Sequence, residues 1–125
     1  MDWDTLPFFD QHPDALPLYE ALEQQILAGI PDVRIKVQKT QISFYNRHLF
    51  ACASFLRVKR KQELPPCYLV VTVGLARRLD SPRVAAATEP YPGRWTHHIV
   101  VSAPGQIDAE LMGWVREAAA FAAQK

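Results

Sequence analysis

The sequence is poor in the features that would assign it to several large protein classes. It contains two cysteines, Cys52 and Cys67, and both lie within apolar stretches without a CxxC spacing. Isolated cysteines in such positions usually behave as small hydrophobic side chains, so the sequence predicts neither a disulfide framework nor a zinc site. This pattern favours a reducing, cytoplasmic setting, with a disulfide between the two cysteines as the less favoured alternative.

Long apolar runs are also missing. The longest run, YLVVTVGLA at residues 68–76, is far too short to cross a bilayer. The N-terminal stretch MDWDTLPFF is acidic and lacks the basic start and the long apolar stretch of a signal peptide. We therefore expect a cytoplasmic protein without a membrane partner.

No motif in the sequence specifies a reaction. GxSxG, a Gly-rich phosphate loop and HExxH are all absent, which leaves hydrolase elbows, nucleotide loops and familiar zinc sites without support. A cysteine nucleophile needs an accessible, electropositive setting, and neither cysteine has one in these apolar patterns. The sequence therefore favours a protein that is not an enzyme, with no cofactor and no metal.

What the sequence does contain fits one globular domain over residues 1–125. Hydrophobic residues make up 49% of the chain and the formal net charge is +1, which excludes disordered and fibrous classes. Apolar residues four positions apart predict a first helix from Asp14 to about Gly29. Asp108 is placed to cap a second helix that ends near Ala123, with Trp114 or Val115 in its buried stripe.

Between the helices, several segments have the alternating or β-branched patterns of strands. They are residues 33–38, the two halves of a hairpin on either side of residues 45–48, residues 67–73, more weakly residues 84–88, and residues 95–102. In the hairpin turn, Asn46 would supply the positive φ angle that tight turns require. The order predicts an α+β fold, an antiparallel sheet of about five or six strands with the N- and C-terminal helices packed on one face.

The stretch EPYPGRWTHHIVVS contains two adjacent histidines. Neighbouring side chains on a strand point to opposite faces, so His97 and His98 are poorly placed to bind one metal ion. The alternation places His97 with Ile99 on the interior side, where we expect a hydrogen-bonded core histidine. It places His98 with Thr96 on the polar side. Residues 91–94 are typical of a β-turn, with Gly93 in a left-handed conformation.

Several motifs carry a resemblance to a known family. They are KTQISF at residues 39–44, LDSPRV at 79–84, EPYPGRWTHH at 89–98 and the terminal helix. From Tyr19 to Phe121 the chain resembles the bacterial domain-of-unknown-function family numbered five-six-five-five. The resemblance implies a small α+β domain, alone or attached to larger bacterial proteins, and supplies no catalytic residues. The motif positions are Lys39, Thr40, Gln41, Ser43, Arg83, Glu89, Tyr91, Arg94, Thr96, His97 and His98.

Positive charge is concentrated in the strand region. Residues 34–94 hold twelve Lys or Arg residues and three acids, whereas the rest of the chain holds two basic residues and ten acids. A basic sheet face with hydrogen-bonding and aromatic side chains suits an anionic ligand, a nucleic acid or an acidic protein partner. The alternative is that these basic residues are ordinary solvated surface charges and bind nothing.

We expect the site on the face that the helices leave open. The candidate ligand-binding residues are Arg94, His98, Lys36, Gln41, Arg83 and Tyr91. An alternative is a small enzyme that uses His98 with Glu89 or Tyr91 and an arginine anchor, because the pKa of histidine suits proton transfer near neutral pH. The sequence leaves the ligand and the oligomeric state open.

Overall fold

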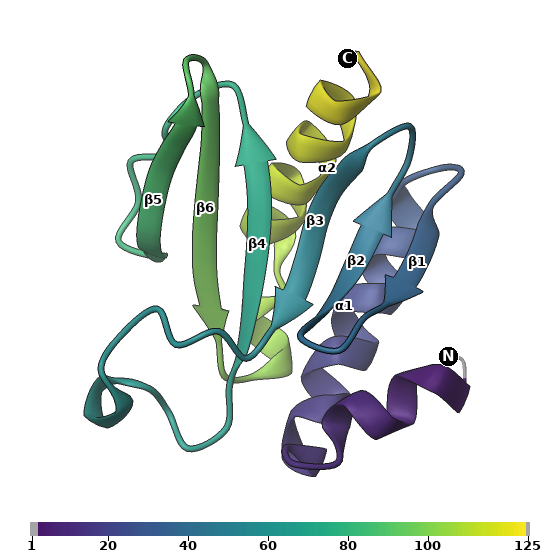
Figure 1. Ribbon diagram of the computed structural model, residues 1–125, viewed down its shortest axis with the longest axis vertical. Helices are drawn as coiled ribbons and strands as arrows, with labels where there is room; N and C mark the ends of the chain where they lie inside the picture. Colours follow the sequence, from purple (N-terminus) through teal and green to yellow (C-terminus); the bar gives the residue numbers. More distant parts are fainter. Residues whose placement is uncertain (1–2, 125) are drawn as a thin grey trace.

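Six strands form one antiparallel sheet in the computed structural model of the chain, which describes residues 3–124 (Figure 1). The strands are β1 (Arg34–Val37), β2 (Gln41–Tyr45), β3 (Leu49–Ser54), β4 (Leu69–Leu75), β5 (Val84–Tyr91) and β6 (Arg94–Val101). Their order across the sheet is β1-β2-β3-β4-β6-β5, with every neighbouring pair antiparallel. β5 is eight residues long and continues into the β5–β6 hairpin, so it extends beyond the short strand expected at residues 84–88.

Both long helices lie behind the sheet in Figure 1, which confirms the predicted α+β arrangement with one covered face. They are α1 (Leu16–Gly29) and α2 (Ala109–Ala123). Residues 3–124 also contain four 3₁₀ helices, namely η1 (Trp3–Phe9), η2 (Pro13–Ala15), η3 (Lys61–Glu63) and η4 (Pro104–Gln106). Pro13 and Pro17 each stand near the start of their element, where the missing N–H costs little.

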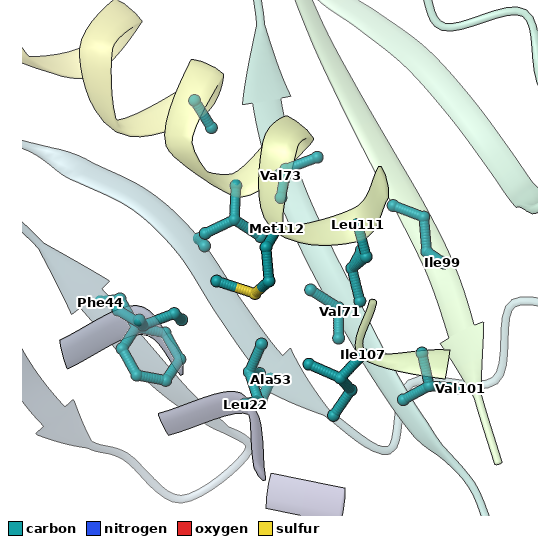
Figure 2. Close-up of a cluster of buried hydrophobic side chains, with 14 of the residues drawn as sticks. Leu22, Phe44, Ala53, Val71, Val73, Ile99, Val101, Ile107, Leu111 and Met112 are labelled. Carbon is teal, nitrogen blue, oxygen red and sulfur yellow. The ribbon is translucent and has the colours of Figure 1, made fainter. Parts of the chain in front are cut away.

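The core lies between the helices and the covered face of the sheet. Figure 2 shows Leu111 and Met112 of α2 among side chains from β4 and β6, including Val71 and Ile99. All four of these side chains are buried. Because alternate residues of a strand share a face, this burial assigns every second residue of β4 and β6 to the helices.

The stripe of α2 that faces the sheet contains Val115, and not Trp114. Val115 is fully buried, whereas the Trp114 ring is half-buried and lies under the guanidinium of Arg83, 5.7 Å from its centroid. Asp108 caps the helix as predicted, because its carboxylate accepts a hydrogen bond from the N–H of Leu111 at 3.0 Å. That bond and the neighbouring Arg83 lower the pKa of Asp108.

The two hairpin turns lie where the sequence placed them, but one forms for a different reason. Gly93 has φ 76°, as its turn predicts. Asn46 does not adopt a positive φ, so the reason given for it was wrong. Its side chain ties the turn instead, because Nδ2 donates to the carbonyl of Ala119 at 2.7 Å and Oδ1 accepts from the N–H of His48 at 3.3 Å.

Candidate functional site

A row of polar side chains crosses the open face of the sheet at a single level. The strand registers place Ser43 of β2 opposite Cys52 of β3, Cys52 opposite Thr72 of β4, and Thr72 opposite His98 of β6. The row exists because each of these positions has the parity opposite to the core residues of its strand. Ser43 is fully buried, so the members that can meet a ligand are those that line a hollow on this face, Cys52, Thr72 and His98.

His98 is held in a fixed orientation within this row. Its Nδ1 lies 2.8 Å from the hydroxyl oxygen of Thr72, and this bond leaves Nε2 to meet a ligand. The ring is half-buried, and burial lowers the pKa of His98 below its ordinary value of 6.5. The imidazole is therefore neutral at pH 7 and can either donate or accept a hydrogen bond.

Cys52 is the one sulfur in the row. Burial raises the pKa of its thiol, and a hydrogen bond with Thr72 only partly opposes that shift. The thiolate is the reactive form of cysteine, so burial keeps Cys52 in its unreactive form at neutral pH. Cys67 is also a free thiol, and it donates to the carbonyl oxygen of Asp14 at 3.3 Å.

A hollow of about 660 Å³ opens above Cys52, Thr72 and His98 of this row, and we refer to it as the open-face hollow. Its lining is formed by Phe8, Gln11, His12, Lys39, Thr40, Gln41, Cys52, Ser54, Phe55, Leu56, Arg57, Thr72 and His98. Figure 1 shows why such distant segments meet, since the N-terminal turns and the loop after β3 both lie at the lower end of the sheet. The floor is the sheet itself, and the walls come from these two segments and from the β1–β2 turn, which contributes Lys39 and Thr40.

One wall of the open-face hollow is built from flat rings. The rings of Phe8 and Phe55 are stacked with centroids 5.5 Å apart, and the ring of His12 stacks on Phe55 at 4.0 Å. Phe9 is buried behind them and contacts Phe55 edge to face at 5.8 Å. Packed rings of this kind form a rigid apolar surface against which another planar group can stack.

The rim of the open-face hollow is positively charged. Lys39 and Arg57 are exposed lining residues, and neither forms an ion pair with any residue in 3–124. The loop after β3, which contains Arg57, continues with Lys59, Arg60 and Lys61. A cation without a protein partner is available to an anion, and an arginine offers the planar fork that fits carboxylate and phosphate groups.

Two of the six residues expected to bind a ligand line the open-face hollow, namely His98 and Gln41. Gln41 also donates from Nε2 to the hydroxyl of Ser43 at 2.8 Å, so it supports the floor. Lys36 lies on the same face of the sheet, opposite Ser43 in the register, but does not line the hollow. The alternation within the strands was sufficient to place these three side chains on one face.

The structure places Arg94 and Tyr91 elsewhere, in the hairpin that joins β5 to β6. Both line a smaller hollow of about 210 Å³. The guanidinium of Arg94 lies 6.0 Å from the ring centroid of Tyr91 and 5.9 Å from that of Phe121. The predicted grouping of Arg94 with His98 is therefore not formed, because the long side chain turns toward α2 at the end of the strand.

Arg83 is bound at the start of α2. Its Nη1 lies 2.9 Å from Asp108 Oδ1 and 3.0 Å from Glu110 Oε1, and its Nη2 donates to the carbonyl of Gln106 at 2.7 Å. These bonds join the β4–β5 loop to the first turn of the helix. With its donors engaged in this way, Arg83 holds the helix start in place and takes no part in the open-face hollow.

The acid–base pair of the enzyme alternative is not assembled. His98 lies opposite Ala86, and Glu89 is three residues further along β5, which corresponds to about 10 Å at the rise of a strand. The carboxylate of Glu89 accepts a hydrogen bond from the N–H of Gly93 at 3.1 Å. Glu89 therefore supports the turn of the hairpin.

His97 lies in the interior as the alternation predicts. It is 0% exposed, and its Nε2 accepts a hydrogen bond from the N–H of Leu79 at 2.9 Å. Burial lowers the pKa of His97, and the carbonyl of Val73 opposes this only in part. Because Nε2 accepts this bond, the proton of the neutral ring is on Nδ1. The bond joins the segment after β4 to β6.

The sequence did not identify the aromatic wall of the open-face hollow. His12 and Phe55 are separated by more than forty positions, and no local pattern indicates that their rings will stack. Arg57 carried a weak signal, because it opens a basic loop. Contacts of this type depend on where η1 and η2 fold back along the sheet.

Within residues 3–124, no group of three or more His, Cys, Asp or Glu side chains is close enough to hold a metal ion. The helices of the same part of the chain are too short or too polar to cross a membrane.

A family model matches most of the chain. The model of a family described as Domain of unknown function (DUF5655) matches residues 7–122, which include all six strands and the lining of the open-face hollow. This confirms the resemblance that the sequence motifs indicated. No match was found among curated proteins or among solved structures.

Proposed function

Because the chain belongs to the DUF5655 family, whose description specifies no activity, we propose a function from the site itself: a binding module for a small anionic ligand. The ligand occupies the open-face hollow. It carries a planar group that stacks against the ring wall and an acidic group that meets the cations of the rim.

The observation that carries this proposal is the combination of three surfaces around one hollow. The ring of Phe55 stacks with two others on one side, the floor presents Thr72 and His98, and Lys39 and Arg57 stand at the rim. Small-molecule sites typically enclose about 300–1,000 Å³ and combine apolar walls with a few placed polar groups. The open-face hollow has that size and that composition.

The volume and shape favour a small molecule over the other partners considered. A nucleic acid strand would use a basic groove with successive stacking platforms along its path. Here the stacked rings of Phe8, His12 and Phe55 are gathered at one end of the sheet. Binding is favoured over turnover, because Cys52 is protonated at neutral pH and Glu89 is engaged away from His98.

Isothermal titration calorimetry of the protein with adenosine monophosphate at low salt tests the proposal. The nucleotide supplies a planar ring and an anion, and we expect it to bind about tenfold more tightly than adenosine or inorganic phosphate. Arg57→Gln and His98→Ala should each weaken binding. Arg94→Gln is the matched control, because Arg94 lies outside the open-face hollow and its removal should leave the affinity unchanged.

Two results would contradict the proposal. One is the absence of saturable binding of the nucleotide, and the other is an equal loss of affinity in the Arg57 and Arg94 variants. Binding of a single-stranded oligonucleotide without binding of the mononucleotide would instead favour the nucleic-acid alternative.

A further inference from the structure

A second hollow lies on the other side of the sheet, at the opposite end of the molecule. Its volume is about 900 Å³, and we refer to it as the helix-side hollow. It is lined by Gly29, Ile30, Pro31, Asp32, Val33, Arg34, Asn46, Arg47, Arg116, Ala119, Ala120 and Ala123. Figure 1 shows the end of α1, the β2–β3 turn and the end of α2 together at the upper end of the sheet.

Hydrogen bonds between distant segments hold the walls of this hollow in place. Asn46 donates to the carbonyl of Ala119 at 2.7 Å, and Nδ1 of His48 lies 3.1 Å from the carbonyl of Ala122. Arg34 donates from Nη2 to the carbonyl of Asn46 at 2.9 Å. The β2–β3 turn is thus bound to α2 on one side and to β1 on the other, so the helix-side hollow exists before any ligand enters.

The surface inside the helix-side hollow is largely apolar. Ile30 and Ala119 are buried, Val33 is half-buried, and the small side chains of Ala120 and Ala123 leave room above them. A ligand that fills this space must present an apolar body of its own, because polar groups placed there would lose their hydrogen bonds to water.

Three arginines surround this apolar surface. Arg34, Arg47 and Arg116 are all exposed, and none forms an ion pair with a described residue. Arg116 reaches from α2 to the end of α1, since a Cβ placed on Gly29 would lie 3.9 Å from its Nη1. Asp32 is the single acid in the lining, so the hollow has an excess of positive charge.

We propose that the helix-side hollow binds an organic acid with an apolar body, such as a medium-chain carboxylate. The apolar body of the ligand lies on the alanine surface of α2. Its carboxylate is held by Arg47 and Arg116, with the remaining donors of Arg34 beside them. An arginine fork matches a carboxylate in geometry and remains charged at every physiological pH. This site is separate from the open-face hollow and does not depend on the function proposed for it.

Nuclear magnetic resonance of the whole protein tests this proposal with decanoate as the probe. Decanoate should cause saturable shifts of the backbone amide signals of Ala119, Ala120 and Ala123. Arg116→Gln and Arg47→Gln should each weaken binding about tenfold, the loss typical of one charge-assisted hydrogen bond. Asp32→Asn should tighten binding about threefold, because it removes the one acid near the carboxylate while asparagine keeps the left-handed φ of 57°.

Control variants separate this site from general surface effects. Arg78→Gln removes an exposed arginine outside the helix-side hollow and should leave the affinity unchanged. Ala120→Phe fills the hollow from an exposed position of α2 and should abolish binding while the fold is retained. The amide spectrum reports the fold of each variant in the same experiment.

Three outcomes would overturn the proposal. Decanoate could fail to give saturable shifts at α2, or decyltrimethylammonium, which has the same chain and the opposite charge, could bind there as tightly. Inorganic phosphate could also bind with the affinity of decanoate, which would show that the apolar surface contributes nothing.

Discussion

Ile99 and Val100 are neighbours in β6, yet they belong to two very different environments. Ile99 faces the helices and is 0% exposed, and Val100 faces the open side of the sheet and is half-buried. The covered face is apolar and is sealed by α1 and α2, whereas the open face carries the row from Ser43 to His98. In β6, the side chains on the covered face therefore stabilise the fold, and those on the open face are available for binding.

The largest effect that tests this contrast comes from truncation of the two neighbours. Ile99→Ala should lower the free energy of unfolding by about 3 kcal/mol, because it leaves a cavity between the sheet and α2. Val100→Ala should cost about 1 kcal/mol, because the removed methyl groups are partly in water already. Urea denaturation measures both values, and similar losses would show that the open face is covered after all.

The two adjacent histidines should give smaller losses in the free energy of unfolding, and they compare the same side chain on the two faces. His97→Ala should cost about 2 kcal/mol, since it leaves the N–H of Leu79 buried without an acceptor. His98→Ala should cost less than about 1 kcal/mol, as expected for a partly exposed side chain. If His98→Ala destabilises the protein more than His97→Ala, the assignment of the two faces is inverted.

The same histidines predict a dependence of stability on pH. Burial lowers the pKa of both rings below 6.5, so each ring binds a proton more readily in the unfolded chain. Their contribution to stability is complete above pH 6.5 and decreases as the pH falls from that value toward the lowered pKa in the folded state. Thermal unfolding between pH 7 and about pH 5 should show this loss, and it should be smaller in His97→Gln.

The smallest effect concerns the start of α2. Asp108→Ala should cost about 1 kcal/mol, the usual value for loss of an N-cap. Asp108→Asn retains a cap and loses only the exposed ion pair with Arg83, so it should cost less. The hydrogen bond from Leu111 and the pairing with Arg83 lower the pKa of Asp108 below 3.8, so the stabilisation is present above that pH and is lost below it. Asp108→Asn should remove this part of the acid dependence of the melting temperature.

The division into two faces could be predicted from the sequence, because a strand repeats every two residues and the core residues then fix the parity. His97 and His98 were separated correctly on that basis. The orientation of α2 about its own axis was less certain, since the apolar pattern admits both Trp114 and Val115. The sheet selects the smaller Val115, and Trp114 packs at the edge beneath Arg83.

The composition of the candidate site could be predicted only in part. Strand alternation identifies His98 and Gln41 but gives no information on how η1 and η2 return to the sheet with Phe8 and His12. Arg94 was grouped with His98 because strand parity and the positive charge of residues 34–94 placed both on the open face, and Arg83 was a further candidate. The long side chains of Arg83 and Arg94 find partners across the fold, at Asp108 and Phe121, and contacts at such separations have no local signature.

The bonds between the β2–β3 turn and α2 also determine how the molecule opens locally. Asn46 and His48 bind the carbonyls of Ala119 and Ala122, which lie in the last two turns of α2. The last turn of α2 cannot fray without releasing the hairpin, 73 residues away in sequence. Amide hydrogens in these two segments should therefore exchange with solvent at matched rates, as a single cooperative unit.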